Sequence, residues 1–597
     1  MTEENIIWDL NQSFFKGFDD PEIQEYIDKA NNKAKNLLKW KMLIQSPEMT
    51  PEKLVDILKE SEEVSYLISR PYIYAMLSSA SNAQNKKALE LYSRMVQNAA
   101  NLESELNFIG LELGELLTKR PKDFLESPVL IEYKHTLEKT LREHPYKLSE
   151  NEEKIIIEKD LDGTKAWNKL QEEWLSNREF EVTINGETKT VPFGKYKPMI
   201  QDPDPAVRQQ AIKNILGSIG KDAELYAAAL RAVCGNHLRE SKRRGYKDAM
   251  EPSFLLFDVT RGMIDALMQT VEGNAELCQN IYRLKAKSLG TEKLKGADFE
   301  VPVPGEDDRV LSWQEGVQLV IDSYKKFDPE IGEIVEYMVK NNRIDASPRV
   351  GKRAGAFCMS DFGSKSAYVL ISYNGSIDDT VTLAHELGHG IHATLSNRQQ
   401  NFTETSPPMV IAETASIFGE MIIIDRLIQE APNDKAKRTL LFNQLLRLAE
   451  VIFEVGSRVF IEQGYYDTIE KGEYLDSIKA SEIFFEGRKR IYGDLIEWED
   501  EQKYEWCWKP HYYFHDRRFY NYPYVFAQMV VLSLYAKYKQ EGASFIPKYK
   551  EFLSAGGSIS PLELGKKIMN VDMADPNFWE LGMNEVKRLY HELEKLI

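Results

Sequence analysis

The sequence predicts a mainly α-helical protein with a small β-sheet beside its candidate site. Helix-start signals recur along the chain, as at Asp20-Pro21 and Thr50-Pro51, where a capping side chain precedes a first-turn proline. Residues 83–118 form a long stretch rich in Leu, Ala, Glu and Lys, which are strong helix formers. Strand signals, in contrast, are confined to a few short segments.

The helical elements are supported by apolar periodicity and by further caps. After Asp20, apolar residues recur on one face of the expected helix, at positions 23, 26, 27, 30, 34, 37 and 38. Ser312 with Glu315, and Ser560 with Glu563, have the spacing of capping boxes. We therefore expect helices throughout the chain.

The clearest strand signal is a hairpin near residue 185. Residues 182–184 and 188–191 are rich in Val, Ile and Thr, and they flank Asn185-Gly186, a pair typical of tight hairpin turns. The segments around 355–359 and 368–373 indicate two short strands just ahead of the main motif. We place a domain boundary after the hairpin, which gives an N-terminal helical region (1–195) and a second domain (196–597) that contains the motif.

Composition excludes several classes of partner. Hydrophobic residues make up 43% and charged residues 28% of the chain, as is ordinary for globular proteins. The formal net charge is −18, from 76 basic and 94 acidic residues. Phosphate backbones and anionic lipid surfaces need clustered Lys and Arg, so we expect no nucleic-acid partner and no membrane partner.

Cysteine usage and the N-terminus predict a cytoplasmic protein. The chain has four widely spaced cysteines without a CxxC pair, which fits buried thiols in a reducing compartment. The first residues are acidic and resemble no secretory signal. Residues 519–536 lack formal charge, but they contain Pro523, Asn521 and three tyrosines, so we expect a buried helix there and no membrane span.

The main motif is HELGH at residues 385–389. On a helix, residues four apart lie one turn on and about 40° round, so His385 and His389 can share one metal ion. Glu386 sits about 100° round from His385, beside the metal and not on it. A carboxylate next to metal-activated water is what peptide hydrolysis requires. We expect the motif on a helix spanning about 380–395.

A third metal ligand must come from elsewhere, because hydrolytic zinc sites use three protein ligands and leave one position for water. A Ser-Pro-Pro break at 406–408 precedes an apolar helix that contains Glu413. A buried carboxylate needs a partner, and a cation is the natural one. The alternative for Glu413 is a first-turn acid that is favoured by the helix dipole.

Two neighbouring residues have more than one interpretation. Glu420 lies seven residues after Glu413 on the same helix face, where it either supports the metal ligands or is an ordinary acid. His392 lies seven residues after His385, and we interpret it mainly as a core or supporting residue, with an additional metal ligand as the alternative.

These residues resemble the oligoendopeptidase F branch of the thimet-oligopeptidase-like zinc peptidases, of the gluzincin type. The resemblance rests on TLAHELGH (382–389), ETAS (413–416), PHYY (510–513) and FYNYPY (519–524), and extends over about 200–585. It implies one zinc ion held by His385, His389 and Glu413, with Glu386 as the base. It also implies a large helical zincin-type peptidase with a deep substrate channel that admits short peptides.

The segment from PHYY to FYNYPY (510–524) is called the late block below. For it, the resemblance implies that His511 and a tyrosine, Tyr520 or Tyr524, assist the transition state. A Tyr hydroxyl or His N–H can donate to the negative charge that develops on the carbonyl oxygen. The alternatives are an aromatic-rich core helix for either tyrosine, and His515 in place of His511. The loop from 512 to 519 is charged and aromatic, whereas the thimet branch has a glycine-rich loop there.

The predicted function is a zinc-dependent endopeptidase that hydrolyses short peptides. A second hypothesis is a zinc carboxypeptidase or dipeptidase with the same site, in which Arg517 or Arg518 would hold the substrate's terminal carboxylate. A third is a non-catalytic peptide-binding helical scaffold, which the intact set of four motif residues disfavours.

Overall fold

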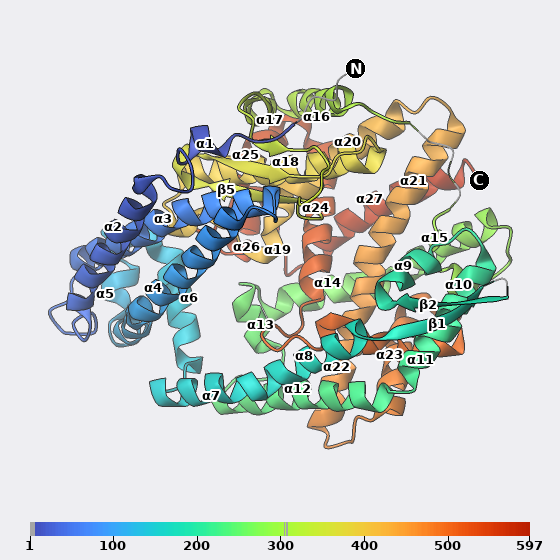
Figure 1. Cartoon of the computed structure of the whole chain (residues 1–597), viewed down its shortest axis with the longest axis horizontal. Coiled ribbons are helices and arrows are strands. Elements are labelled where there is room, and N and C mark those ends of the chain that lie inside the picture. The colour runs from blue at the N-terminus through green and yellow to red at the C-terminus, as the bar shows by residue number, and fades with distance from the viewer. Residues whose placement is uncertain (1–5, 185, 304, 306–308) are drawn as a thin grey trace. The chain divides into compact units, whose positions relative to one another are not determined.

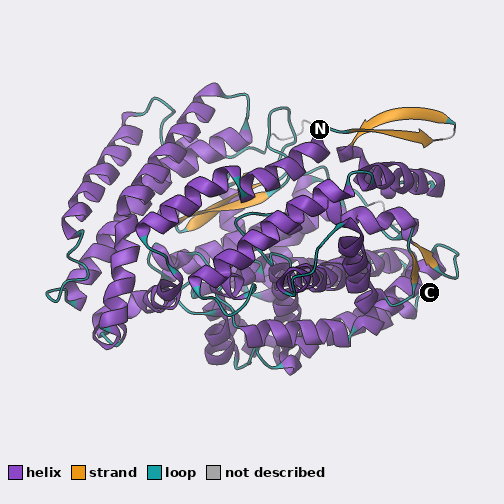
Figure 2. Cartoon of the chain, turned by 90° about the horizontal axis from the view of Figure 1, so that it is seen from below, coloured by secondary structure: helices purple, strands orange, loops and turns teal. Residues whose placement is uncertain are grey.

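The structure is a computed structural model that describes residues 6–184, 186–303, 305 and 309–597. Helices dominate and the strands are few and short, as Figure 2 shows. The predicted mainly α fold class is confirmed. Contacts divide the chain into two compact units, each built from three segments. Unit 1 contains residues 6–145, 309–427 and 537–571, and unit 2 contains 146–303, 305, 428–536 and 572–597.

The helices of unit 1 begin largely where the sequence predicts. Asp20 caps α2 ahead of Pro21, and Thr50 caps α3 ahead of Pro51. The long stretch predicted at 83–118 is α4. The α-helices of this unit are α1 (Leu10–Ser13), α2 (Pro21–Leu37), α3 (Pro51–Ser81), α4 (Lys86–Lys119), α5 (Pro121–Leu125), α6 (Lys134–Glu143), α16 (Trp313–Phe327), α17 (Pro329–Lys340), α18 (Ile377–Gln399), α19 (Met409–Ala412), α20 (Thr414–Gln429, whose last two residues count with unit 2), α25 (Phe545–Ser554) and α26 (Pro561–Leu564).

Two apolar cores hold the N-terminal helices of unit 1. One lies among α2, α3, α4 and α6, which lie side by side in Figure 1. The other joins α1, α2, α3 and α4 to the sheet, because Tyr368 and Leu370 of the central strand pack against Trp8, Phe14 and Tyr74. The sheet is therefore buried against the N-terminal part of the unit.

The small sheet of unit 1 has the strand order β4-β6-β5. Its members are β4 (Ile344–Asp345), β5 (Phe357–Asp361) and β6 (Ser366–Leu370), with β6 parallel to β4 and antiparallel to β5. The central strand is buried along its whole length. Helix α18 packs on β5 and β6, so the sheet lies directly beside the helix that carries the HELGH motif. The predicted strands at 355–359 and 368–373 correspond to β5 and β6. β5 lies about two residues later in the chain than predicted, and β6 lies about two residues earlier.

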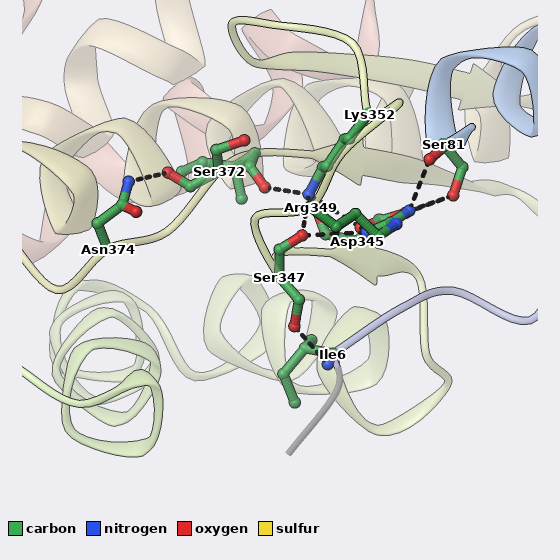
Figure 3. Close-up of polar contacts among 9 residues, drawn as sticks. Ile6, Ser81, Asp345, Ser347, Arg349, Lys352, Ser372 and Asn374 are labelled. Carbon is green, nitrogen blue, oxygen red and sulfur yellow. Dashed lines mark hydrogen bonds and ion pairs between the residues drawn. The ribbon is translucent and has the colours of Figure 1, made fainter. Parts of the chain in front are cut away.

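A buried carboxylate joins this sheet to the end of α3. Asp345 is fully buried and accepts hydrogen bonds from Ser81 Oγ (2.7 Å) and from both terminal nitrogens of Arg349 (2.6 Å each). The Lys352 ammonium lies 2.9 Å from the same carboxylate. Figure 3 shows Ser81, Arg349 and Lys352 converging on Asp345, while the nearby Ser347 hydroxyl accepts from the backbone of Ile6.

Unit 2 is a second helical body with two small β elements. Its α-helices are α7 (Glu150–Asp162), α8 (Thr164–Ser176), α9 (Tyr196–Ile200), α10 (Pro205–Ala211), α11 (Gly217–Gly220), α12 (Ala223–Arg244), α13 (Glu251–Leu256), α14 (Arg261–Gly273), α15 (Ala275–Ser288), α21 (Asp434–Ala449), α22 (Val455–Glu470), α23 (Ser477–Tyr492), α24 (Tyr522–Glu541, whose end counts with unit 1) and α27 (Pro576–Glu594). The short strands β3 (Leu294–Lys295) and β7 (Ile496–Glu497) pair in parallel.

The hairpin of unit 2 has the predicted position. β1 (Glu179–Ile184) and β2 (Glu187–Pro192) pair antiparallel, with Ile184 opposite Glu187. The predicted turn residue Asn185 lies outside the described residues. The division into domains 1–195 and 196–597 remains a prediction. The two compact units have other boundaries, because each consists of three separate segments.

Residues 519–536 belong mainly to α24, a largely buried helix, as predicted. Within the part of the chain that the structure describes, no helix combines the length and apolarity that crossing a membrane requires. All four cysteines are free thiols, three of them buried and Cys358 half-buried.

We expect Asp345→Asn to destabilise the protein by about 3 kcal/mol at pH 7, because it leaves the buried Lys352 ammonium without its partner charge. Burial alone would raise the pKa of Asp345, but the hydrogen bonds from Arg349, Lys352 and Ser81 hold that pKa below its ordinary 3.8. Because the folded pKa is the lower one, the stabilisation is complete above pH 3.8 and is lost as the pH falls through the folded value.

Urea unfolding of the wild type, Asp345→Asn and Asp56→Asn at pH 7, 5 and 3.5 measures this difference. Asp56 lies on the exposed face of α3 and serves as the control. The difference in the free energy of unfolding between wild type and Asp345→Asn should be constant from pH 7 to 5 and should become smaller at lower pH. Equal stability of the two Asn variants at pH 7 would contradict this account.

Candidate metal and catalytic centre

The HELGH motif lies on α18, a helix that is longer than predicted. It spans 377–399, against the predicted 380–395. The N-cap is Ser376, whose hydroxyl accepts from the Asp379 N–H while the Asp379 carboxylate accepts from the Ser376 N–H. Asp379 is thus the partner of Ser376 in a capping box.

Helix α20 approaches α18 closely at Gly388. A Cβ atom at this position would lie 2.6 Å from Ser416 Cα and would also collide with the Ala415 carbonyl oxygen. Only glycine allows this approach of two backbones. The Tyr324 hydroxyl donates to the Ala384 carbonyl (2.8 Å) and joins the start of the motif to α16. No local sequence pattern indicates this role for Tyr324, which lies 60 residues from Ala384 on another helix.

Three donor atoms converge between α18 and the start of α20. Glu413 Oε2 lies 3.4 Å from His385 Nε2 and 3.3 Å from His389 Nε2. One ligand atom from each residue lies within 4.8 Å of the other two. Ligands at two corners of a tetrahedron with ~2.1 Å bonds are roughly 3.4 Å apart, so these separations suit zinc. The structure thus brings together the three predicted ligands.

Glu413 reaches this position because the helix is interrupted there. The sequence predicts one continuous apolar helix, but Glu413 links α19 to α20 with φ −83° and ψ 3°. The Ser416 hydroxyl donates to Glu413 Oε2 (2.7 Å) and orients the carboxylate. Burial alone would raise the pKa of Glu413, but His389, His385 and Ser416 outweigh it and lower that pKa to about 2. The carboxylate is therefore held ionised, as metal binding requires.

Glu420 supports one of the imidazoles from behind. Its Oε1 lies 2.6 Å from His385 Nδ1, the ring nitrogen that faces away from Glu413. Burial would lower the pKa of His385, but Glu420 outweighs this effect and raises it. Such a carboxylate fixes the ring so that Nε2 faces the metal position. Of the two interpretations of Glu420, the supporting one agrees with this geometry.

Glu386 lines the same cavity as the three predicted metal ligands. Its side chain is on α18, the residue is 6% exposed, and Oε2 has no hydrogen-bond partner among the residues that the structure describes. Burial raises the pKa of Glu386, while His385 and His389 oppose that rise. A buried carboxylate oxygen without a partner needs a proton or a water to satisfy it. Glu386 therefore has the environment of a general base.

A cavity of about 430 Å³ opens at this site. Its lining includes His385, Glu386 and Glu413 from the donor region, together with Phe357 and Cys358 of β5. His392 also lines it, and its buried Nε2 has no hydrogen-bond partner among the described residues. Among the described strands, β5 pairs on one side only, so its other edge is available to an extended peptide.

The late-block residues form their own cluster in unit 2. The rings of His511 and Tyr520 are nearly parallel with centroids 6.1 Å apart, and Tyr524 lies 5.4 Å from Tyr520 and 5.8 Å from His511. His515 instead contacts Asn168 (3.2 Å). The three predicted residues therefore belong to one constellation, and neither tyrosine is fully buried as a core residue would be.

His511 is held as a neutral imidazole. Burial, and then the positive charges of Arg458 and Lys509, lower its pKa to about 4. Within the described part of the chain, its buried Nδ1 has no hydrogen-bond partner. A neutral imidazole with an unused nitrogen can donate one hydrogen bond to a developing oxyanion.

Comparison with known proteins finds matching family patterns and related sequences. The pattern of "Peptidase family M3" matches residues 198–585, and that of "Oligopeptidase F" matches 112–180. The chain is 24% identical over 559 residues to an oligoendopeptidase F homolog from Lactococcus lactis, covering 92% of this chain and 90% of that protein.

Solved structures share the whole fold. A protein from Chlamydophila abortus, assigned as a peptidase, superposes with a TM-score of 0.88 at 21% identity, covering 99% of this chain and 98% of that chain. Oligoendopeptidase-F from Enterococcus faecium has a TM-score of 0.68 at 21% identity, covering 98% and 99%.

We expect Glu420→Gln to weaken zinc binding by about 10- to 100-fold, because a neutral amide orients and polarises the His385 ring less well than a carboxylate. Competition with a zinc chelator on the purified protein measures the affinity without reference to turnover. Glu333→Gln, on an exposed position of α17, is the matched control. If both variants hold zinc as tightly as the wild type, Glu420 has no role at the metal position.

Proposed function

This chain belongs to peptidase family M3, and from that premise we propose that it hydrolyses short peptides at a single zinc ion held by His385, His389 and Glu413. The family makes the chain a metallo-endopeptidase. The observation that carries the assignment of the ligands is the 3.3 and 3.4 Å convergence of the two imidazoles on one carboxylate oxygen.

The proposed ligand set fits zinc chemically as well as geometrically. Two imidazole nitrogens and one carboxylate oxygen are the donors of hydrolytic zinc sites, which keep a fourth position open. The chemistry that bound zinc supplies is Lewis acidity, which polarises the scissile carbonyl and lowers the pKa of water. Ser416 and Glu420 hold Glu413 and His385 in place for this purpose.

Glu386 is the proposed general base. Its unpartnered Oε2 accepts a proton from the attacking water while the water oxygen bonds to the scissile carbonyl carbon. The carbon–nitrogen bond then breaks, and Glu386 returns the proton to the leaving amine nitrogen. The burial that raises the pKa of Glu386 makes its carboxylate a better proton acceptor near neutral pH.

The remaining proposed roles concern the substrate. An extended peptide pairs with the unpaired edge of β5, which binds main chain without regard to sequence. His511, with Tyr520 or Tyr524, donates hydrogen bonds to the oxyanion of the tetrahedral intermediate. The neutral state of His511 favours donation over proton exchange.

The exopeptidase alternative loses its local support. Arg518 is 4% exposed, and its nitrogens are occupied by Tyr466, Tyr512 and Phe514. Arg517 is exposed and paired with Asp516. Neither arginine is arranged to receive a terminal carboxylate. The scaffold alternative is disfavoured because all four motif residues are present and three of them, His385, His389 and Glu413, converge.

The setting of the reaction is also a proposal. We expect short peptides as the partners and the cytoplasm as the compartment, with neither nucleic acid nor membrane as a binding surface. Support comes from the four free thiols and from the acidic net charge of −18.

A peptide of about ten residues, acetylated at its N-terminus and amidated at its C-terminus, tests the proposal. The wild type should cleave it internally, and a zinc chelator should abolish cleavage. Glu386→Gln should retain one equivalent of zinc, measured by metal analysis, and lose at least about 10²-fold in kcat.

Two outcomes would contradict the proposal. An intact blocked peptide alongside cleavage of the unblocked one would establish an exopeptidase. Wild-type turnover by Glu386→Gln would exclude Glu386 as the base.

A further inference from the structure

An ion pair lies buried beside the late-block cluster in unit 2. Glu462 of α22 is 0% exposed and Arg518 is 4% exposed, and Arg518 Nη2 lies 3.5 Å from Glu462 Oε1. Replacing such a pair with apolar residues is often neutral or stabilising, so overall stability alone does not account for it. Its contacts indicate another purpose.

Arg518 holds the segment that follows His511. Its Nη1 donates to two carbonyl oxygens, those of Tyr512 (2.8 Å) and Phe514 (2.9 Å). Its Nε donates to the Tyr466 hydroxyl (2.6 Å), which anchors the guanidinium to α22. The backbone directly after His511 is therefore fixed at two points by one rigid planar group.

Glu462 holds both neighbours of Tyr520. Its Oε1 accepts from the Phe519 N–H (2.9 Å), and its Oε2 accepts from Asn521 Nδ2 (3.1 Å). Phe519 has φ +55°, a left-handed conformation that a residue with a bulky side chain adopts only when its surroundings impose it. The buried Phe519 ring packs on the Tyr466 ring, with their centroids 4.7 Å apart, and this contact supplies part of that constraint.

We propose that Arg518 and Glu462 are positioning residues that fix His511 and Tyr520 in the arrangement used for transition-state stabilisation. This inference rests on the proposed function, in which His511 and a tyrosine donate to the oxyanion, and it takes Tyr520 as that tyrosine. The ion pair joins two groups of contacts: Arg518 binds the backbone after His511, and Glu462 binds the Phe519 N–H before Tyr520 and the Asn521 side chain after it. These contacts hold the rings of His511 and Tyr520 nearly parallel, with their centroids 6.1 Å apart.

The first test is Arg518→Lys, since a single ammonium cannot reach both carbonyls, Tyr466 and Glu462 at once. A displacement of about 1 Å at a catalytic group costs on the order of 10²-fold, so we expect kcat to fall about 10- to 100-fold. KM should change less than about twofold, and zinc content should be unchanged, because the hydrogen bonds described for Arg518 and Glu462 are made to residues of unit 2. Arg243→Lys, an exposed arginine on α12, is the matched control and should retain wild-type kcat.

A double-mutant cycle separates positioning from a general structural defect. Residues that act as one unit have strongly non-additive effects on kcat. In a Tyr520→Phe background, Arg518→Lys should therefore cause less than about a threefold further loss. Full additivity of the two losses, or a wild-type kcat for folded Arg518→Lys, would overturn the inference.

A milder variant, Tyr466→Phe, keeps the inference testable if Arg518→Lys fails to fold. Tyr466→Phe removes only the hydroxyl that accepts from Arg518, and we expect about a 3- to 10-fold loss in kcat, again with little effect on KM. Wild-type kcat in this variant would overturn the inference.

The single variants Tyr520→Phe and His511→Gln distinguish this inference from the proposed function. If both retain wild-type kcat, the proposed oxyanion roles fail and the positioning role fails with them. If both lose activity while Arg518→Lys and Tyr466→Phe do not, only the positioning role is wrong.

Discussion

The centre depends on one close approach of two backbones. At Gly388, α20 comes so near to α18 that a Cβ would lie 2.6 Å from Ser416 Cα. That approach brings Glu413 to the two imidazoles and Glu420 to the rear of His385. Any other residue at this position would separate the helices, and the donor atoms would lie too far apart to share an ion. The sheet under α18, held to α3 through Asp345, keeps the motif helix in place while α20 approaches it.

Local spacing was sufficient to predict the donor region of this site. The four-residue separation of His385 and His389 places both rings on one helix face, and Glu413 stood out as an acid in an apolar segment. The sequence could not show that the helix breaks at Glu413, because no proline or glycine marks the break. Tyr324 and Ser416 were also missed. A tyrosine 60 residues upstream and a serine within a helix have no local pattern that distinguishes a supporting role from an ordinary one.

The late block shows a different limit of sequence reasoning. Arg517 and Arg518 look equivalent in sequence, and both were considered for binding a terminal carboxylate. In the structure Arg517 is exposed, whereas Arg518 is buried against Tyr466 and Glu462, which lie more than 50 residues earlier. Burial of this kind is decided by tertiary packing. The same reason explains why a linear boundary at 195–196 differs from the compact units, each of which collects three separate segments.

The central claim is that His385, His389 and Glu413 bind one zinc ion. X-ray diffraction from crystals of the active protein, recorded just above and just below the zinc absorption edge, tests it most directly. The account predicts a single anomalous peak about 2.1 Å from one atom of each of the three residues. An active crystal preparation with no peak there, or with its zinc bound by other side chains, would contradict it.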